Sequence, residues 1–369
     1  MKTTKLKIRN LNSNYTIVVG KNILNQIPKQ IKTLCPGVQK IALVTDKNVP
    51  KKFKIKLKHY LKKYNVFTFE YNVNEKFKSF VNVNKLVEKC LANNFNRNDV
   101  LISLGGGILG DYSAFAASII KRGINFINIP TTLLAQVDSS IGGKTGVNSS
   151  KGKNLIGSFY QPKLVISDVE ILKSLPQREL VCGYAEILKH SLILKSSFFN
   201  WLKKYSSTLL RSRNSNLLQK AIVESCKIKL YFVKKDVFEK NIRMILNFGH
   251  TFAHAYEAAL GYSKKLNHGE AVILGIKTAL NFSLKNNLLK KNEYNLIINH
   301  ISKANLPSNL KKFFKIKDLN KILSFMIKDK KNNSDKISLV LLKKIGSPII
   351  NKEYSKKNLR LFLKNELSN

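Results

Sequence analysis

Apolar and polar residues alternate along the first half of the chain with two different periods. A two-residue period at residues 6–8 and 15–19 predicts a β-hairpin at the start. The continuous apolar run at residues 41–46 ends in a carboxylate and is typical of a buried parallel strand. The alternation continues with helical spacing at 53–64, a weaker strand at 66–70, a helix at 84–93 and a second buried strand at 100–104. This order predicts an α/β fold with a mostly parallel sheet and helices on both faces.

The second half of the chain has the spacing of helices. The segments with a helical period are 179–194, 198–210 and 217–233, followed by two helices that contain histidines. Residues 337–342 alternate enough for one late strand or an extended segment. A chain of 369 residues is long for one core, and about two domains are expected. We therefore predict an α/β domain at residues 1–177 and an all-α domain at residues 178–369.

The charge of the chain is strongly positive, with 65 Lys and Arg against 22 Asp and Glu and a net charge of +43. Such a charge is compatible with binding to nucleic acid, to an anionic membrane surface or to acidic substrates. The lysines are spread along every segment and mixed with Asn and Ile, without an aromatic and basic ladder. This distribution favours solvated lysine-rich faces, and we expect no nucleic-acid partner.

The cysteines and the apolar runs indicate the compartment. Cys35, Cys90, Cys182 and Cys226 are widely separated, which predicts reduced and mostly buried thiols. The first residues carry positive charge without an apolar core behind it, and no apolar run is long enough to span a bilayer. We expect a cytoplasmic protein without a membrane contact.

Three of the six histidines lie close together in the second half of the chain. Within Asn247-Phe-Gly-His250-Thr-Phe-Ala-His254, the two imidazoles are four residues apart and emerge from one face of a helix. His268 begins the next apolar helix, and a carboxylate would complete a three-ligand catalytic zinc site. Thr251 stands where the metalloprotease motif has Glu. The residues alone leave two interpretations open, a metal or catalytic site and a set of hydrogen-bonded core histidines.

A glycine-rich segment, Gly105-Gly-Gly107-Ile-Leu-Gly110-Asp111, directly follows the strand at 100–104, and a helix is predicted at 112–120. Glycines let backbone N–H groups approach a phosphate, and the start of a helix adds positive potential. The spacing departs from the Gly-x-Gly-x-x-Gly fingerprint, and such a turn equally serves close packing. Its place after a buried strand favours a nucleotide-binding loop.

A polar stretch follows the predicted strand at 126–129. It runs from Gln136 to Asn154 and is rich in glycine, hydroxyl groups and lysine. An anion-binding loop is the functional interpretation, and a long solvated loop is the alternative. Loops of this length without regular structure are usually functional in a compact domain, which favours the first.

Four motifs in this order resemble the 3-dehydroquinate synthase family of the sugar-phosphate cyclase superfamily. They are the segments 104–111, 130–148 and 152–162 and the histidine window. The resemblance extends from about Asp46 to Lys331. It implies a Rossmann-like NAD-binding domain, a helical metal- and substrate-binding domain, and an active site in the cleft between them.

The resemblance also implies roles for individual residues. The metal ligands would be Glu186, His250 and His268, with His254 next to them. The NAD-binding residues would be Asp46, Glu75, Lys78, Gly107, Ile108, Leu109, Gly110, Asp111, Thr131, Thr132, Lys144, Lys153 and Ser174. The substrate-binding residues would be Arg122, Lys144, Lys153, Asn154, Lys189, Lys229, Arg243, Asn247, His254 and Lys330. The residues expected to act in catalysis are Asp138, Lys144, Lys189, Arg243, Asn247 and His254. Without the motifs, each lysine would be taken as an ordinary solvated side chain.

The activity that the resemblance implies is the conversion of 3-deoxy-D-arabino-heptulosonate 7-phosphate, a sugar acid phosphate, to 3-dehydroquinate and phosphate. The family reaction uses transient oxidation by NAD, phosphate elimination, re-reduction and an intramolecular aldol step, with zinc or cobalt as the divalent metal. Arg122 resembles an arginine that reaches the phosphate of a neighbouring subunit, so a homodimer is expected. Two alternatives are another sugar-phosphate cyclase and a metal- and NAD-dependent polyol dehydrogenase.

The chain departs from the family pattern at a few positions. Tyr184 stands where the family usually has Leu, His190 where Tyr is common, and Ala253 where Gly is frequent. The acidic stretch before Arg243 reads Asp236-Val-Phe-Glu239 and has lost its charged interior. None of these changes removes an implied metal ligand or substrate contact.

Overall fold

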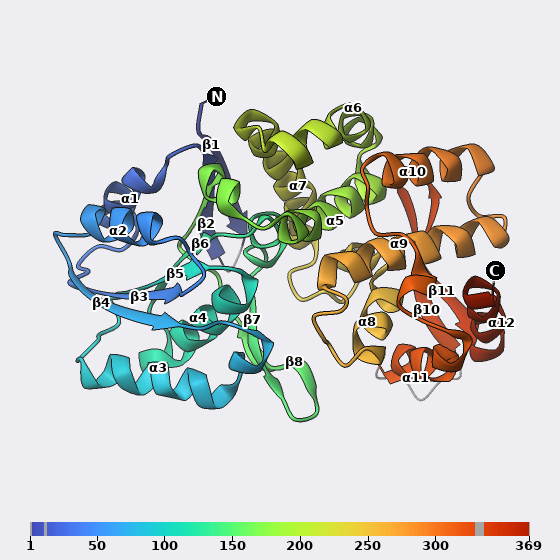
Figure 1. Cartoon of the computed structure of the whole chain (residues 1–369). Helices are drawn as coiled ribbons and strands as arrows, with labels where there is room; N and C mark the ends of the chain where they lie inside the picture. Colours follow the sequence, from blue (N-terminus) through green and yellow to red (C-terminus); the bar gives the residue numbers. More distant parts are fainter. Residues whose placement is uncertain (1, 11–12, 329–335, 369) are drawn as a thin grey trace. The chain divides into compact units, whose positions relative to one another are not determined.

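The computed structural model describes residues 2–10, 13–328 and 336–368. These residues form two compact units (Figure 1). The first unit is Met1–Pro176 with Arg213–Leu230, and the second is Gln177–Ser212 with Tyr231–Asn369. The segment 213–230 thus groups with the first unit, although it follows part of the second in the chain. The boundary after residue 177 and the cleft between two domains stay predictions.

Within the described residues, a seven-stranded sheet forms the centre of the first unit. Its strands are β1 (Thr4–Asn10), β2 (Ser13–Gly20), β3 (Lys40–Asp46), β4 (Asn65–Tyr71), β5 (Val100–Gly105), β6 (Asn125–Pro130) and β9 (Leu164–Asp168), in the spatial order β1-β2-β9-β6-β5-β3-β4. The pair β1 and β2 is antiparallel, and every other neighbouring pair is parallel. The predicted hairpin and the predicted mostly parallel sheet are both confirmed.

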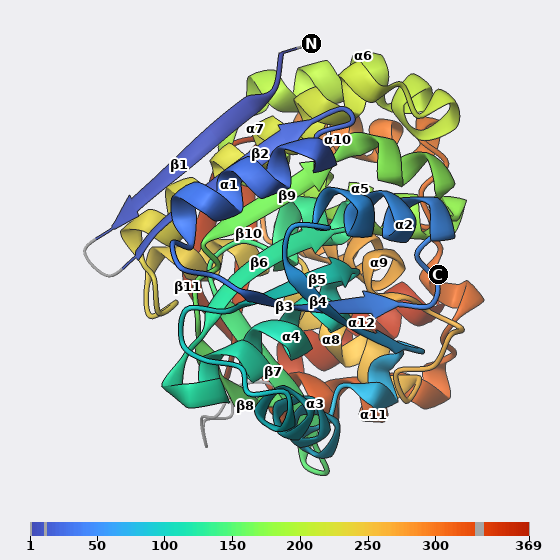
Figure 2. The ribbon, with the colours of Figure 1, turned by 90° about the vertical axis from the view of Figure 1, so that its left-hand side faces the viewer.

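Helices cover both faces of this sheet because successive strand residues point to opposite sides. In β3, Ile41 and Leu43 pack with the core under α1 (Ile27–Leu34) and α2 (Lys51–Tyr60). Ala42 and Val44 pack with the opposite core, under α3 (Phe80–Ala92) and α4 (Gly107–Ile119). Figure 2 shows the two helix pairs on the two sides of the strands. Each fully buried aliphatic side chain stabilises these layers by about 1.5–3 kcal/mol relative to an exposed one.

The polar stretch at 136–154 is more ordered than predicted. A π-helical turn, η4 (Ala135–Ser139), precedes an antiparallel pair, β7 (Lys144–Ser149) and β8 (Gly152–Phe159). A Cβ atom on Gly146 would lie 2.5 Å from Ile156 O, and one on Gly157 would lie 2.0 Å from Thr145 O. The prediction of a long loop was therefore wrong, because the glycines that suggested a loop are what allow these two strands to approach.

The second unit is mostly helical. Its helices are α5 (Gln177–Leu194), α6 (Ser196–Ser212), α8 (His250–Ala259), α9 (His268–Lys285), α10 (Lys291–Lys303), α11 (Leu319–Lys328) and α12 (Lys356–Ser368). Helix α7 (Ser215–Lys235) begins in the first unit and ends in the second. The short helical turns of the chain are η1 (Leu24–Gln26), η2 (Glu75–Phe77), η3 (Ile120–Arg122), η5 (Val169–Ser174), η6 (Ile242–Asn247), η7 (Leu310–Lys312) and η8 (Ile316–Asp318).

The prediction of an all-α second domain needs a correction. The late strand expected at 337–342 is present as β10 (Lys336–Lys344), and it pairs with β11 (Ser347–Ser355) in an antiparallel hairpin. The sequence of β10 has a strand pattern because its buried side chains, Ile337, Leu339 and Leu341, alternate with more exposed ones. The sequence of β11 is polar and contains Pro348, so it gives no strand pattern of its own.

The cysteines agree with a further prediction. All four cysteines are buried free thiols. Burial raises the pKa of Cys35 to about 11, so this thiol stays protonated. Across residues 2–10, 13–328 and 336–368, no helix is long and apolar enough to cross a membrane.

Candidate active site

The carboxyl ends of β3 and β5 form one part of the candidate site. These strands are parallel neighbours, with Thr45 beside Leu104. From β3 the chain continues outward to β4, whereas from β5 it continues in the opposite direction to β6. Ligands of open α/β sheets bind at such a switch point. The structure thus places Asp46, at the end of β3, next to the glycine-rich segment that follows β5.

The glycine-rich segment packs closely and also begins a helix. Helix α4 starts at Gly107, five residues before the predicted start, with Gly106 as its N-cap. A Cβ atom on Gly107 would lie 2.7 Å from Ser139 Oγ, and one on Gly106 would lie 3.2 Å from Thr132 Cγ2. The glycines therefore serve close packing, as one interpretation proposed. Ile108 and Leu109 lie in the first turn of α4, where N–H groups without an intrahelical partner favour a phosphate. Gly110 already donates its N–H to Gly106 O at 3.0 Å, and Asp111 follows it in the helix.

Three other residues of the implied NAD set lie in turns after strands. Thr131 donates its N–H to Gly105 O at 2.9 Å, which holds the end of β6 beside the end of β5. Thr132 Oγ1 accepts a hydrogen bond from Ala135 N at 3.2 Å. Ser174 is exposed at the end of η5, where its hydroxyl donates to Ile171 O.

Lys78 joins several implied site residues into one polar cluster. Its buried Nζ lies 2.6 Å from Asp111 Oδ2 and 2.5 Å from Asn154 Oδ1. Lys153 Nζ lies 3.8 Å from Glu75 Oε2. Burial raises the pKa of Asp111, and the ammonium of Lys78 partly offsets this rise. We call Glu75, Lys78, Asp111, Lys153 and Asn154 the Lys78 cluster.

Asn148 belongs to the same region but was not among the predicted site residues. Its Nδ2 donates to Glu75 Oε1 at 2.7 Å, and its Oδ1 accepts a hydrogen bond from Asn154 N at 2.9 Å. Its own N–H donates to Lys78 O at 2.9 Å. Asn148 therefore joins Glu75, Asn154 and the backbone of Lys78 within the Lys78 cluster. Its position at the end of the matched motif 130–148 was the one sequence feature that could have indicated it.

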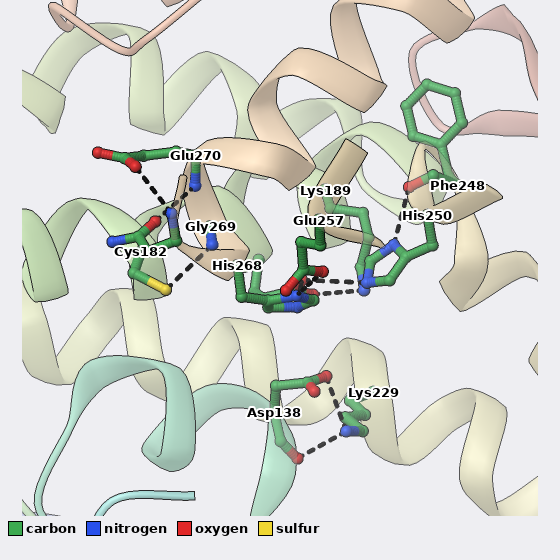
Figure 3. Close-up of polar contacts among 12 residues, drawn as sticks. Asp138, Cys182, Lys189, Lys229, Phe248, His250, Glu257, His268, Gly269 and Glu270 are labelled. Atoms are coloured by element: carbon green, nitrogen blue, oxygen red, sulfur yellow. Dashed lines mark hydrogen bonds and ion pairs between the residues drawn. The ribbon is translucent and has the colours of Figure 1, made fainter. Parts of the chain in front are cut away.

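A second pair in the first unit joins residues that are far apart in the sequence. Lys229 Nζ lies 2.6 Å from Asp138 O and 2.7 Å from Asp138 Oδ1 (Figure 3). Lys229 is buried on α7, whereas Asp138 is partly exposed in η4. Lys144, at the start of β7, is exposed. The structure thus brings Asp138, which is expected to act in catalysis, together with Lys229 of the implied substrate site.

The implied metal ligands of the second unit converge from three helices. Glu186 lies on α5, His250 begins α8 and His268 begins α9. Glu186 Oε1 is 3.4 Å from His250 Nε2 and 3.7 Å from His268 Nε2. One ligand atom from each residue lies within 4.8 Å of those of the other two. Because two imidazoles and a carboxylate at this spacing form a common catalytic zinc set, the residues fit a divalent metal.

The burial of Glu186 provides a separate test of that fit. Its side chain is 0% exposed, next to the Lys189 ammonium and the two imidazoles. Its Oε2 forms an ion pair with the buried Lys189 ammonium, whereas its Oε1 faces both imidazole Nε2 atoms. Burying a carboxylate is costly unless opposite charges compensate it, and a bound cation would add to the compensation that Lys189 supplies. A fully buried carboxylate that faces two imidazole Nε2 atoms favours the metal interpretation over hydrogen-bonded core histidines.

The electrostatics of the three groups suit metal binding. Burial alone would raise the pKa of Glu186, but Lys189 and His250 outweigh it and keep this pKa well below its usual range. Burial and the charge of Lys189 lower the pKa of His250 to about 4, so its ring is neutral. Burial would lower the pKa of His268, but Glu257 and Glu186 raise it to about 10. A metal would thus meet a carboxylate and a neutral imidazole, and would displace a proton from His268.

Two close helix crossings hold these ligands in place. A Cβ atom on Gly269 would lie 2.2 Å from Cys182 Cα, so α9 and α5 touch through their backbones one turn from Glu186. A Cβ atom on Gly275 would lie 2.2 Å from Gly249 O, so α9 and the start of α8 touch beside His250. Gly249 has a φ of +78°, a left-handed conformation that favours glycine. The same helix, α9, therefore fixes both of the other ligand-bearing helices.

The remaining implied residues of the second unit lie around this centre or in the segment before it. The ring centroid of His254 is 5.4 Å from that of His250 and 6.4 Å from that of His268. Buried Arg243 donates from Nη1 to Val237 O at 2.5 Å, and its Nε lies 3.9 Å from Glu239 Oε2. Asn247 Nδ2 donates to Glu239 Oε1 at 3.0 Å. Glu239, which was not predicted, thus contacts both of them.

Comparison with known proteins identifies the family. Family models of the N-terminal and C-terminal domains of 3-dehydroquinate synthase match residues 68–182 and 183–332. The chain is 55% identical over 364 residues to the 3-dehydroquinate synthase of Pelagibacter ubique strain HTCC1062, covering 99% of each chain. The chain belongs to the 3-dehydroquinate synthase family. The relative from Bradyrhizobium diazoefficiens is 38% identical, with 96% of this chain and 94% of the relative covered.

A solved structure of a related enzyme agrees with the family assignment. The crystal structure of 2-deoxy-scyllo-inosose synthase with carbaglucose-6-phosphate, NAD+ and Co2+ matches with a TM-score of 0.88 and 25% identity. The match covers 98% of this chain and 100% of the other. The predicted combination of a Rossmann-like domain and a helical domain is therefore confirmed.

The structure explains two departures from the family pattern. Tyr184, in place of the usual Leu, is fully buried on α5, and its hydroxyl lies 2.8 Å from His300 Nε2 on α10. The extra polar group therefore has a buried partner. Ala253, in place of Gly, lies at the crossing of α8 and α9, where its Cβ would be 3.2 Å from one on Gly275. The methyl group is tolerated because Gly275 supplies the space.

Arg122 and Lys330 are the last two residues that the family resemblance implies. Arg122 is exposed at the end of η3 with a φ of +65°, directly after Lys121 with a φ of +50°. Consecutive left-handed residues other than glycine are strained, and such strain is common at functional sites. Lys330 lies outside the described residues.

Proposed function

We propose that this chain converts 3-deoxy-D-arabino-heptulosonate 7-phosphate to 3-dehydroquinate and phosphate. The observation that carries the proposal is the Glu186, His250 and His268 centre, in which a fully buried carboxylate faces two imidazoles from separate helices. That centre lies in a chain that is 55% identical to a 3-dehydroquinate synthase over nearly its whole length. Family membership and metal-site chemistry thus support the same activity.

The cofactors that we propose are NAD and one divalent metal, zinc or cobalt. Glu186, His250 and His268 would hold the metal through one carboxylate oxygen and two Nε2 atoms. The nucleotide would lie at the switch point, against the start of α4, Asp46, Thr131, Thr132, Ser174 and the Lys78 cluster. When bound, NAD supplies a reversible hydride acceptor and the metal supplies a Lewis acid.

The positive side chains would bind the two anionic ends of the substrate. A sugar acid phosphate carries a phosphate and a carboxylate, which require ammonium and guanidinium donors. We assign this role to Lys144, Lys153, Lys189, Lys229 and Arg243, with Asn154 and Asn247 as neutral donors. Asp138 already contacts Lys229, so it would orient that ammonium toward the substrate.

His254 is the residue that we propose for proton transfer. It lies one turn after His250 on the same face of α8, with its ring 5.4 Å from the His250 ring. It is partly exposed, unlike fully buried Glu186, so a substrate can reach it. With Asn247 nearby in sequence, its imidazole would hold and return a proton as phosphate leaves.

The chain presents an apolar edge that fits the expected homodimer. Leu155, Ile156 and Phe159 on β8 are 57%, 37% and 45% exposed. Among the described residues, β8 is an outer strand of a two-stranded sheet, and exposed apolar side chains on such a strand are typical of an interface with another chain. Arg122, in its strained turn, would reach the phosphate in the partner's site. We also propose the NAD-binding domain at 1–177, the metal- and substrate-binding domain at 178–369, and a cytoplasmic location.

A second candidate is another sugar-phosphate cyclase, because a synthase that binds carbaglucose-6-phosphate shares the fold at a TM-score of 0.88. Its substrate class lacks the carboxylate that buried Lys229 and Arg243 would bind. A polyol dehydrogenase would have no use for the phosphate-binding lysines.

The test is a phosphate-release assay with the purified protein and catalytic amounts of NAD. Our proposal predicts phosphate from the heptulosonate phosphate without net NADH, loss of activity after chelation, and recovery with zinc or cobalt. A hexose 6-phosphate, which lacks a carboxylate, should give no product. Turnover of the hexose phosphate alone would favour the second candidate, and accumulating NADH would favour a dehydrogenase.

A further inference from the structure

Glu257 lies directly behind one of the proposed metal ligands, in a place that the sequence analysis did not single out. It is on α8, seven residues after His250, and is 7% exposed. Its Oε2 lies 3.0 Å from Nδ1 of His268, which belongs to α9 (Figure 3). A buried carboxylate on one helix thus contacts a ligand on another.

This contact determines which of the two ring nitrogens of His268 carries the proton. A carboxylate accepts hydrogen bonds and cannot donate them when ionised, so Nδ1 carries the proton. Nε2 lies on the other side of the ring, 3.7 Å from Glu186 Oε1. When the ring is neutral, its lone pair is therefore on Nε2 and points to the side where Glu186 and His250 lie.

The other proposed histidine ligand, His250, also has an acceptor behind its ring, but that acceptor is a backbone carbonyl group, which a substitution cannot remove. His250 Nδ1 lies 3.3 Å from the backbone carbonyl oxygen of Phe248. Both rings therefore have an acceptor behind Nδ1, and Glu186 faces both Nε2 atoms. The acceptor behind His268 is a side chain, so its contribution can be measured.

We propose that Glu257 is a positioning residue of the metal centre, which fixes the tautomer and the ring orientation of His268. This inference rests on the proposed function, because it presupposes a bound divalent metal. Carboxylates behind histidine ligands typically change metal affinity by about 10- to 100-fold when they are removed. Glu257 would also join α8 to α9 at the ligands, in addition to the crossing at Gly275.

The test compares three variants of the full chain by chelator competition with zinc and with cobalt. Glu257→Leu keeps a similar volume and removes the acceptor, so the dissociation constant should rise by about 10- to 100-fold. Glu257→Gln keeps an acceptor oxygen and should stay within a few fold of the unchanged protein. Glu224→Gln, which alters a carboxylate paired with Lys227 on α7, is the matched control and should change nothing.

A second readout separates positioning from simple stabilisation of the fold. In ¹⁵N-histidine NMR of the metal-free protein, the His268 Nδ1–H should exchange slowly in the unchanged protein and in Glu257→Gln, and rapidly in Glu257→Leu. Normal metal affinity in Glu257→Leu would overturn this inference alone. Equal losses of affinity and of thermal stability in both Glu257 variants would also overturn it, since that is the result of a structural role. If the unchanged protein bound neither metal, the proposed function would fall, and this inference with it.

Discussion

At the scale of single residues, the site depends on groups whose burial is tolerated only because their partners are in place. Glu186 is fully buried beside Lys189, His250 and His268, which arrive from the same helix and from two others. These three positive or polar groups would lose their shared partner if this carboxylate were removed. A substitution that removes one of these charges can therefore disrupt the site even when it keeps the volume of the side chain.

Glu186→Gln should abolish metal binding with little change in volume. The neutral amide is a poor ligand, and it leaves the buried Lys189 ammonium without its ion pair. We expect metal affinity and phosphate release to fall by more than about 100-fold, beyond the effect of removing an outer partner. Metal content after dialysis and the phosphate assay measure this, with Glu224→Gln as the control. A variant that retained stoichiometric zinc would exclude Glu186 as a ligand.

His300 should make the stability of the protein depend on pH. Burial and the charge of Lys203 lower its pKa to about 4, from 6.5. A lowered pKa means that the unfolded state binds the proton more readily, so the contribution is fully present above pH 6.5 and is lost as the pH falls to about 4.

His300→Leu should therefore lose less stability on acidification. Between pH 7 and pH 4, we expect the unchanged protein to lose up to about 3 kcal/mol more than this variant. Urea unfolding at several pH values measures the difference. Parallel pH profiles of the two proteins would show that His300 is not the titrating group.

At the scale of elements, helix α9 organises the proposed metal centre. It supplies His268 and crosses α5 at Gly269 and the start of α8 at Gly275. Its start is fixed by a capping box, in which Asn267 Oδ1 accepts a hydrogen bond from Glu270 N and Glu270 Oε2 accepts one from Asn267 N. The sequence predicted these helices from their apolar spacing and the cluster of histidines. It did not predict the crossings, since a glycine inside a helical pattern does not say which neighbour approaches it.

Gly269→Ala should separate α9 from α5. The new methyl group would lie 2.2 Å from Cys182 Cα, which is backbone and cannot rotate away. We expect a loss of about 1–3 kcal/mol of unfolding free energy, as for other overpacked sites, together with weaker metal binding. Gly261→Ala is a useful control, because its Cβ meets open space and its φ of +64° alone is strained. The control should lose stability and keep its metal affinity; equal metal affinity in both variants would refute the role of the crossing.

At the scale of the whole chain, the sequence predicted most elements but not all of their groupings. The strands at 41–46 and 100–104, the helices and the proposed metal ligands follow from local pattern and from the family motifs. Three features do not: the β7 and β8 pair, the β11 strand, and the grouping of residues 213–230 with the first unit. The grouping depends on contacts between residues distant in sequence, such as Lys229 with Asp138, which no local pattern contains. The other two features are local hairpins, and their strands are rich in glycine or polar residues and so give no apolar strand pattern.

The exposed edge of β8 allows a test of the dimer at this scale. Phe159→Lys should yield monomers, because an ammonium would be buried in the proposed contact. Sedimentation velocity measures the assembly, and Ile316→Lys, at a 49% exposed apolar position in the second unit, is the control. If the unchanged protein is monomeric, or if both variants remain dimeric, the proposed interface is wrong.

The central claim is that Glu186, His250 and His268 hold a catalytic metal in a 3-dehydroquinate synthase. Crystals of the zinc- or cobalt-loaded protein, measured on both sides of the metal absorption edge, test it most directly. We expect one anomalous peak about 2.0–2.2 Å from a Glu186 oxygen and from the Nε2 atoms of both histidines. A fully loaded protein whose metal lies on other residues would contradict it.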